Sequence, residues 1–194
     1  MYKSFDHLIK EHDVERKFHY SGSRVVVVPD ACFFRNINTC FFQDMQEKYE
    51  LRFVKGVLGE IHEALRQEFK VDLSTYYKRK SLFYSIPSIK VEVSENDELL
   101  ISKAAKEAYD GLPQKMKKNR RNMKYNGIGN VDMQQITYLL QRARKGLSTL
   151  ALTNDIGVIT TIAELRKDDS FNGFIDGKTV VISSIRHINE KYAA

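Results

Sequence analysis

The sequence predicts an α/β fold with a mainly parallel sheet, and three observations predict it. Residues 25–28 are four consecutive valines bounded by turn residues, which is typical of a strand buried on both faces. Two further short apolar runs, 147–152 and 179–182, have the same character. Segments with helical periodicity lie between these runs, and residues 57–69 are an example. Strands that alternate with helices favour a parallel sheet with helices on its faces.

The expected elements follow in order along a single domain of residues 25–194, preceded by an N-terminal helix or arm over residues 1–24. A segment of about 71–127 reads as an insertion that is helical and basic. The other expected elements are a strand over 25–28, a helix over 41–50, a short strand over 51–54, a helix over 57–69, a helix around 97–109, a helix over 130–145, a strand over 147–152, a helix over 156–167 and a strand over 179–182.

Two of the helices have clear signals. In residues 57–69 the apolar side chains recur at helical spacing from Val57 to Phe69. In residues 130–145 we expect Asn130 to cap the amino end and Gly146 to end the helix.

Composition indicates an ordinary globular protein with a basic balance. The chain has 194 residues, 42% of them hydrophobic, and a net charge of +6. A basic balance favours polyanionic partners such as nucleic acid. No apolar run is long enough to cross a membrane, and no signal peptide is recognisable, so we expect a cytoplasmic protein. Reduced thiols are then expected at Cys32 and Cys40, although their number also permits a disulfide.

Four acidic residues carry the functional hypothesis. Asp30 and Asp155 each follow a predicted strand, where ligands of open α/β sheets bind. Asp132 projects among the inward side chains of its helix, and Glu60 lies at the border of an apolar helical stripe. Each has an ordinary alternative: Asp30 and Asp155 as helix caps, Asp132 as an acid favoured by the helix dipole, and Glu60 as a solvated side chain.

Taken together, these acids predict a metal site. Clustered carboxylates repel one another, and a divalent cation relieves that repulsion. Oxygen ligands suit Mg²⁺ or Mn²⁺, and such ions promote hydrolysis of phosphodiesters. We therefore expect Asp30, Glu60, Asp132 and Asp155 to be both metal ligands and catalytic residues. We expect Thr153 and Asn154 to orient these ligands without touching the metal.

The order of these acids along the chain and the sequence around each of them resemble those of the PIN-domain nucleases. The matching segments are Val28-Pro29-Asp30, Leu58-Gly59-Glu60, Asn130-Val131-Asp132 and Thr153-Asn154-Asp155. The long interval between the second and third acids is similar to that of protein-only RNA-processing PIN enzymes with helical insertions, whereas compact toxin-type PIN proteins have a shorter one. The resemblance covers about residues 25–185 and implies a three-layer α/β/α fold.

The resemblance also implies an activity: metal-dependent endoribonuclease cleavage that leaves a 5′-phosphate and a 3′-hydroxyl. The partner would be RNA, with tRNA or another structured RNA among the candidates, and a homodimer or higher homo-oligomer stays open. The chain departs from the family pattern at Ala31 and Cys32, where small hydroxyl or amide residues are usual. We therefore expect weaker hydrogen bonding around Asp30. The alternatives are a non-catalytic PIN-like module that binds RNA or protein, and a flap-type DNA nuclease.

Two basic segments are candidates for phosphate contacts. For residues 115–124 the alternative is a solvated loop or helix face, which is the usual fate of a run of charges. For the segment from Tyr76 to Tyr84 the alternative is that some of its rings pack in the core. The functional interpretation of both segments is RNA binding, since lysine and arginine neutralise phosphates and tyrosine rings stack on bases. The candidate RNA-binding residues are Lys78, Arg79, Lys80, Lys115, Lys117, Lys118, Arg120, Arg121 and Lys124.

Overall fold

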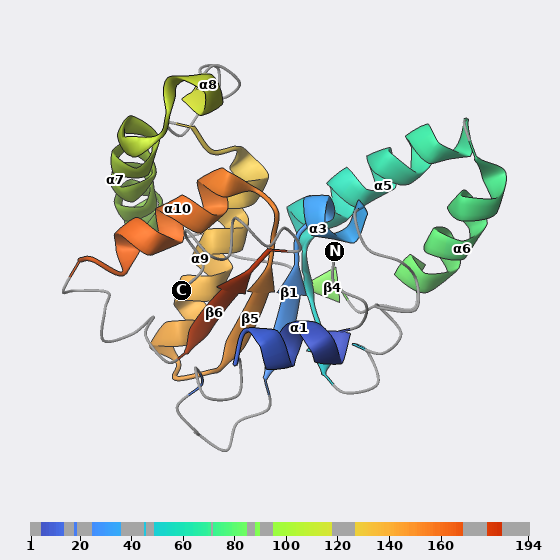
Figure 1. Ribbon diagram of the computed structural model, residues 1–194, viewed down its shortest axis with the longest axis horizontal. Coiled ribbons are helices and arrows are strands. Elements are labelled where there is room, and N and C mark those ends of the chain that lie inside the picture. Colours follow the sequence, from blue (N-terminus) through green and yellow to red (C-terminus); the bar gives the residue numbers. More distant parts are fainter. Residues whose placement is uncertain are drawn as a thin grey trace.

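A four-stranded parallel sheet forms the centre of the protein, seen here in a computed structural model (Figure 1). Its strands are β1 (Val26–Pro29), β2 (Glu50–Leu51), β5 (Thr149–Leu152) and β6 (Thr179–Ile182). The order across the sheet is β2-β1-β5-β6. The structure describes residues 5–13, 18, 25–35, 45, 49–70, 72–84, 88–89, 95–117, 127–168 and 178–183.

The pairing aligns the carboxyl ends of the strands. Val26 to Pro29 pair in register with Thr149 to Leu152, which pair in turn with Thr179 to Ile182. The chain runs from β1 to β2 on one side and reaches β5 on the other side only much later. The strand order therefore reverses between β1 and β5, and such a switch point is where open α/β sheets bind ligands.

Helices flank the sheet. Within the described residues they are α1 (Phe5–Glu11), α3 (Ala31–Arg35), α5 (Lys55–Phe69), α6 (Leu73–Tyr84), α7 (Glu95–Gly111), α8 (Gln114–Lys117), α9 (Asn130–Arg144) and α10 (Ile156–Leu165). None of these helices combines the length and the apolar character that a membrane crossing requires.

The segment expected as an insertion divides into two parts. Helix α7 packs against α10 and α9, and so belongs to the body of the protein. Helix α6 instead folds back on α5, and the two form a hairpin that extends away from the sheet (Figure 1). At the base of this hairpin, β3 (Phe53–Val54) pairs in parallel with β4 (Ser88–Ile89).

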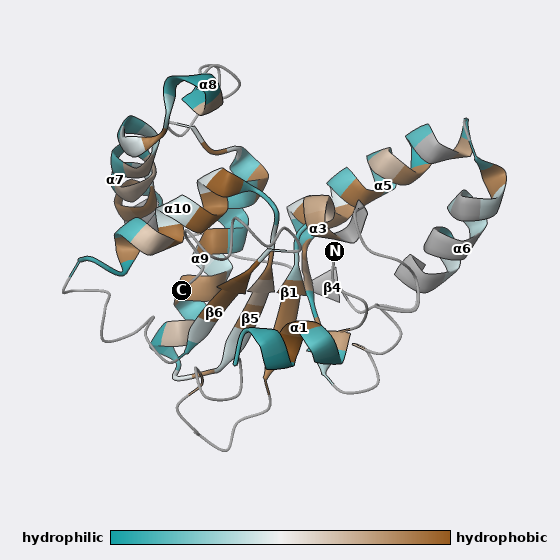
Figure 2. Cartoon of the chain, viewed as in Figure 1, coloured by the Kyte–Doolittle hydropathy of each residue, from teal (hydrophilic) through white to brown (hydrophobic). Residues whose placement is uncertain are grey.

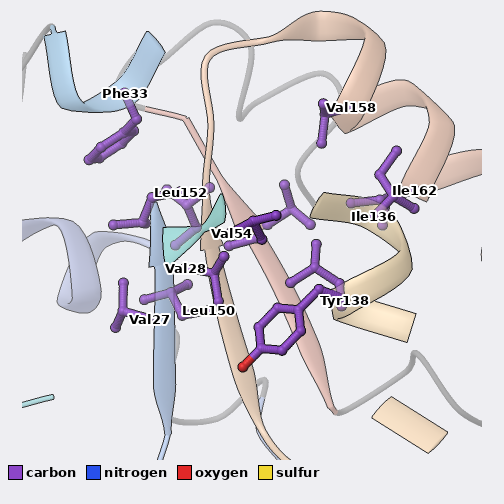
Figure 3. Close-up of a cluster of buried hydrophobic side chains, with 14 of the residues drawn as sticks. Val27, Val28, Phe33, Val54, Ile136, Tyr138, Leu150, Leu152, Val158 and Ile162 are labelled. Carbon is purple, nitrogen blue, oxygen red and sulfur yellow. The ribbon is translucent and has the colours of Figure 1, made fainter. Parts of the chain in front are cut away.

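The strands β1, β5 and β6 lie in the core of the protein. Every residue of β1, β5 and β6 is buried, as expected for a parallel sheet covered on both faces. Figure 2 shows much of these strands in the hydrophobic colour, with paler stretches among them. Figure 3 shows the side chains of Val28, Leu150 and Leu152 in the same buried cluster as Ile136 of α9 and Val158 of α10. This core holds the ends of β1 and β5 in fixed positions.

The main expectations for secondary structure are confirmed, with changes at the margins. The predicted strands 25–28, 147–152 and 179–182 are found as β1, β5 and β6. The predicted strand 51–54 is found as the two short strands β2 and β3, and the helix around 97–109 is longer. Of the predicted helix 41–50, Met45 is helical, but Glu50 already belongs to β2. Most of that segment lies outside the described residues.

Candidate functional site

Asp30 stands directly beyond the last pair of β1 and β5. Its backbone N–H donates to Leu152 O at 2.8 Å, which extends the ladder by one bond. The side chain is only 3% exposed. Its Oδ1 accepts from Ala31 N at 2.6 Å, and its Oδ2 accepts from Thr153 Oγ1 at 2.8 Å. A buried carboxylate requires such donors, because burial without them disfavours the charged form strongly.

Cys32 supplies a further donor that the sequence led us not to expect. Its Sγ donates to Asp30 Oδ2 at 2.8 Å and accepts from Asn154 N at 3.1 Å. The expectation of weak hydrogen bonding around Asp30 is therefore wrong, since a thiol here does the work of the usual hydroxyl or amide. Cys32 takes part in no disulfide, and Cys40 lies outside the described residues.

The protonated state of Cys32 follows from its surroundings. Burial raises the pKa of the Cys32 thiol far above its usual value, and the charge of Asp30 raises it further. The group therefore stays a neutral S–H donor at physiological pH. This thiol is a positioning group for Asp30 and lacks the thiolate character of a nucleophile.

Thr153 and Asn154 have supporting contacts behind the acids. Thr153 Oγ1 donates to Asp30 and accepts from Asp155 N at 3.0 Å, so it ties together the two acids that follow β1 and β5. Asn154 Oδ1 accepts from Ser183 Oγ at 2.8 Å. Ser183 was missed in the sequence, although it follows β6 in the same way that Asp30 follows β1.

Asp155 is the N-cap of α10. Its Oδ1 accepts from Gly157 N at 2.6 Å and from Val158 N at 3.2 Å. The ordinary alternative for this residue is therefore correct as far as capping goes. Capping does not remove its charge from the site, because Asp155 raises the pKa of both Asp30 and Asp132.

Asp132 lies in the first turn of α9, but the cap differs from the expected one. Gly129, not Asn130, is the N-cap residue, and Asn130 is the first residue of the helix. The reason is that Asp132 Oδ2 reaches back and accepts from Gly129 N at 2.9 Å. This bond holds the half-buried carboxylate at the amino end of α9.

The four acids are linked through charge. Burial raises the pKa of Asp132 to about 7, and the charge of Asp155 adds to the effect. The charges of Asp30 and Glu60 raise this pKa further, while the hydrogen bond from Gly129 lowers it. Burial also raises the pKa of Asp30, and hydrogen bonds from Cys32 and Thr153 oppose the rise. Acids from three other parts of the chain thus act on the carboxyl group of Asp132.

Charge coupling is not the same as metal-ligand geometry. Among the described residues, no three His, Cys, Asp or Glu side chains are gathered closely enough to hold a metal ion. Glu60 is exposed on α5, whereas Asp30 is buried at the end of β1. A cation shared by these acids therefore requires the carboxylates to converge from the positions seen here.

The predicted basic residues lie in two places. Lys115 and Lys117 belong to α8, where Lys117 Nζ donates to Asp110 O at 2.7 Å and lies 5.7 Å from the ring centre of Tyr109. Lys80 belongs to α6, with Nζ 5.3 Å from the ring centre of Tyr76. Lys78 and Arg79 are also in α6, but their side chains are not described; Lys118, Arg120, Arg121 and Lys124 lie outside the described residues.

Comparison with known proteins gives no family assignment. No protein-family model, no curated protein and no solved structure matches this chain significantly.

Proposed function

We propose that this chain is a PIN-like nuclease of three-layer α/β/α architecture, which hydrolyses RNA phosphodiester bonds at the site of Asp30, Glu60, Asp132 and Asp155. The observation that carries the proposal is that Thr153 Oγ1 bonds both to Asp30 Oδ2 at 2.8 Å and to Asp155 N at 3.0 Å, which joins the acids after β1 and β5 at the switch point of the sheet. The pKa of Asp132, raised to about 7 by burial and by the charges of the other three acids, supports the same assignment. Perturbed acids beside one another at a switch point are characteristic of functional sites.

The donor chemistry of the site fits Mg²⁺ or Mn²⁺. All four side chains offer carboxylate oxygens, which these ions prefer. The mutual repulsion that raises the pKa of Asp132 is the repulsion that a cation relieves. When bound, the ion supplies activation of water and neutralises charge on the phosphoryl group. Asp30, Asp132 and Asp155 would hold it, with Glu60 joining from α5.

Each residue has a distinct task. Cys32 and Thr153 hold the Asp30 carboxylate in one orientation through bonds to Oδ2. Asp155 is fixed by its capping bonds to the amino end of α10. Asp132 would hold a cation only after losing its proton, because only the charged carboxylate is a good ligand. Glu60 is exposed and lies on the helical hairpin, so it is the acid with most freedom to approach a substrate.

A second candidate is a non-catalytic module that binds RNA. The observation that favours it is that no three such ligand side chains within the described part of the chain are gathered at metal-binding distance. In that case the acids would be a remnant of the site, and the basic residues would carry the function.

One experiment separates the candidates. Purified protein is incubated with labelled tRNA and with unstructured RNA in Mn²⁺, Mg²⁺ or EDTA, and the Asp30→Asn variant serves as the control. The nuclease produces discrete products with 5′-phosphates in metal only, and the variant produces none. RNA that is bound but uncut under all conditions, or cut equally by the variant, rejects the nuclease.

A further inference from the structure

A pocket of about 450 Å³ lies between α5 and α6 and is not lined by any of the four acids. This volume is within the range of small-molecule pockets, about 300–1,000 Å³. The polar and aromatic residues that line it are His62, Glu63, Arg66, Phe69, Tyr76 and Lys80.

Aromatic rings form one wall of the pocket and continue outside it. Phe69 and Tyr76 meet edge to face with ring centres 5.0 Å apart, and Tyr76 meets Tyr77 in the same way at 5.1 Å. Phe69 is 49% exposed and Tyr77 is 60% exposed. Tyr76 is half-buried and packs against the hydrophobic core, so its ring is held in place, while Phe69 and Tyr77 leave much of their surface to solvent. Exposed rings beside an anchored one suit a binding surface.

Cations accompany the rings. Lys80 Nζ lies 5.3 Å from the ring centre of Tyr76, and Arg66 is exposed beside the pocket. Arg66 forms an exposed ion pair with Glu63 at 2.8 Å. Exposed pairs of this kind are weak, so a phosphate can compete for the guanidinium. Rings flanked by cations are complementary to a base and its neighbouring phosphates.

The pocket starts beside one of the proposed catalytic acids. Gly59 lines it and is the neighbour of Glu60 in α5. A Cβ atom added at Gly59 would meet nothing within 4 Å, so this end of the pocket is open. A strand seated between α5 and α6 would therefore reach the turn of α5 that carries Glu60.

We propose that the α5–α6 pocket binds an unpaired base of an RNA strand, with the base stacked on Tyr76 and the adjoining phosphates near Arg66 and Lys80. The position of the pocket beside Glu60 gives this proposal its role in substrate binding, and in that respect it rests on the proposed nuclease function. Stacking selects unpaired over paired RNA without reading sequence.

The test is binding of a short fluorescein-labelled single-stranded RNA to the whole chain, followed by anisotropy in EDTA at one fixed salt concentration. Tyr76→Ala is expected to weaken binding by about 5- to 100-fold, which is the range for loss of one stacked base. Tyr76→Phe keeps the ring and should bind within about twofold of the unchanged protein. A strand without bases should bind weakly and show no difference between the two variants.

A second variant guards against a folding defect. Gly59→Leu fills the open end of the pocket without removing a ring and should also weaken binding. Its matched control is Gly111→Leu, at the end of α7, where an added Cβ also meets nothing within 4 Å. Unchanged binding by folded Tyr76→Ala and Gly59→Leu overturns the proposal. A changed sedimentation coefficient with unchanged RNA binding also overturns it, and identifies the pocket as a contact between two copies of the chain.

The binding test is independent of cleavage. If the unchanged protein cleaves RNA in a metal-dependent way and the pocket variants still bind RNA normally, only the pocket proposal is rejected. Loss of binding in the pocket variants of a protein that never cleaves RNA supports the pocket and removes the nuclease.

Discussion

Thr153 Oγ1 donates a hydrogen bond to Asp30 Oδ2 at 2.8 Å, between residues separated by 123 positions. The bond joins the loop after β1 to the loop after β5, at the point where the strand order reverses. Cys32 Sγ reinforces the junction by donating to the same oxygen. Asp30 is thus oriented by side chains from α3 and from the loop after β5, as is typical of the groups that orient a ligand carboxylate.

Thr153→Val tests this junction. Valine has a similar shape but no donor, so a buried carboxylate loses one partner and Asp155 N loses its acceptor. We expect the free energy of unfolding to fall by about 1–3 kcal/mol, as measured by urea denaturation at pH 7. Thr153→Ser keeps the hydroxyl and should fall by about 1 kcal/mol at most. Equal losses in the two variants would show that the methyl group, not the hydrogen bond, matters.

Cys32 should be an unreactive thiol. Burial and the charge of Asp30 raise its pKa, and only the thiolate reacts with disulfide reagents. In a Cys40→Ser background, a disulfide reagent at pH 8 should modify the native protein far more slowly than the protein in urea. Similar rates in both conditions would mean that the thiol is not held against Asp30.

Asp155 has two roles that one substitution can separate. Asparagine caps a helix as well as aspartate does, so Asp155→Asn keeps the bonds to Gly157 N and Val158 N while it removes the charge. We expect the free energy of unfolding to change by less than about 1 kcal/mol and metal-dependent cleavage to be lost. Asp155→Ala removes the cap as well and should cost about 1 kcal/mol more. Full cleavage by Asp155→Asn contradicts the assignment of this acid.

The sequence was sufficient to predict the sheet and the acids that follow it. A run of valines has few alternatives to a buried strand, and an acid after such a strand must lie at its carboxyl edge. The inward direction of Asp132 was also readable, because helical periodicity determines which face a side chain is on.

The finer contacts were not predictable. The donors Cys32 and Ser183 depend on loops brought together by strand pairing, and neither residue type implies such a contact by itself. The N-cap was assigned to Asn130 from its high propensity, but the side chain of Asp132 bonds to Gly129 N instead. The pocket likewise depends on how α6 folds back on α5, which the pattern of charges and rings does not specify.

Asp132→Asn should make the metal-free protein more stable at high pH. The folded protein holds the Asp132 proton with a pKa of about 7, raised from 3.8, so it binds this proton more tightly than the unfolded chain does. The resulting stability is fully present below about pH 4 and is lost as the pH rises through about 7. The variant has no carboxyl group to ionise and keeps an oxygen for the bond from Gly129 N.

In EDTA at pH 8 we therefore expect the free energy of unfolding of Asp132→Asn to exceed that of the unchanged protein by roughly 1–3 kcal/mol, since one unit of pKa shift is about 1.4 kcal/mol and relaxation reduces the full effect. Near pH 4 the variant and the unchanged protein should have the same free energy of unfolding. Glu107→Gln removes an exposed carboxylate from α7 and should differ by less than about 0.5 kcal/mol at both values. At pH 8, Mn²⁺ should make the unchanged protein more stable than Asp132→Asn, because the ion stabilises only the protein that retains the Asp132 carboxylate as a ligand. If the free energy of unfolding of Asp132→Asn exceeds that of the unchanged protein by the same amount at pH 4 as at pH 8, packing causes the difference and ionisation of Asp132 does not.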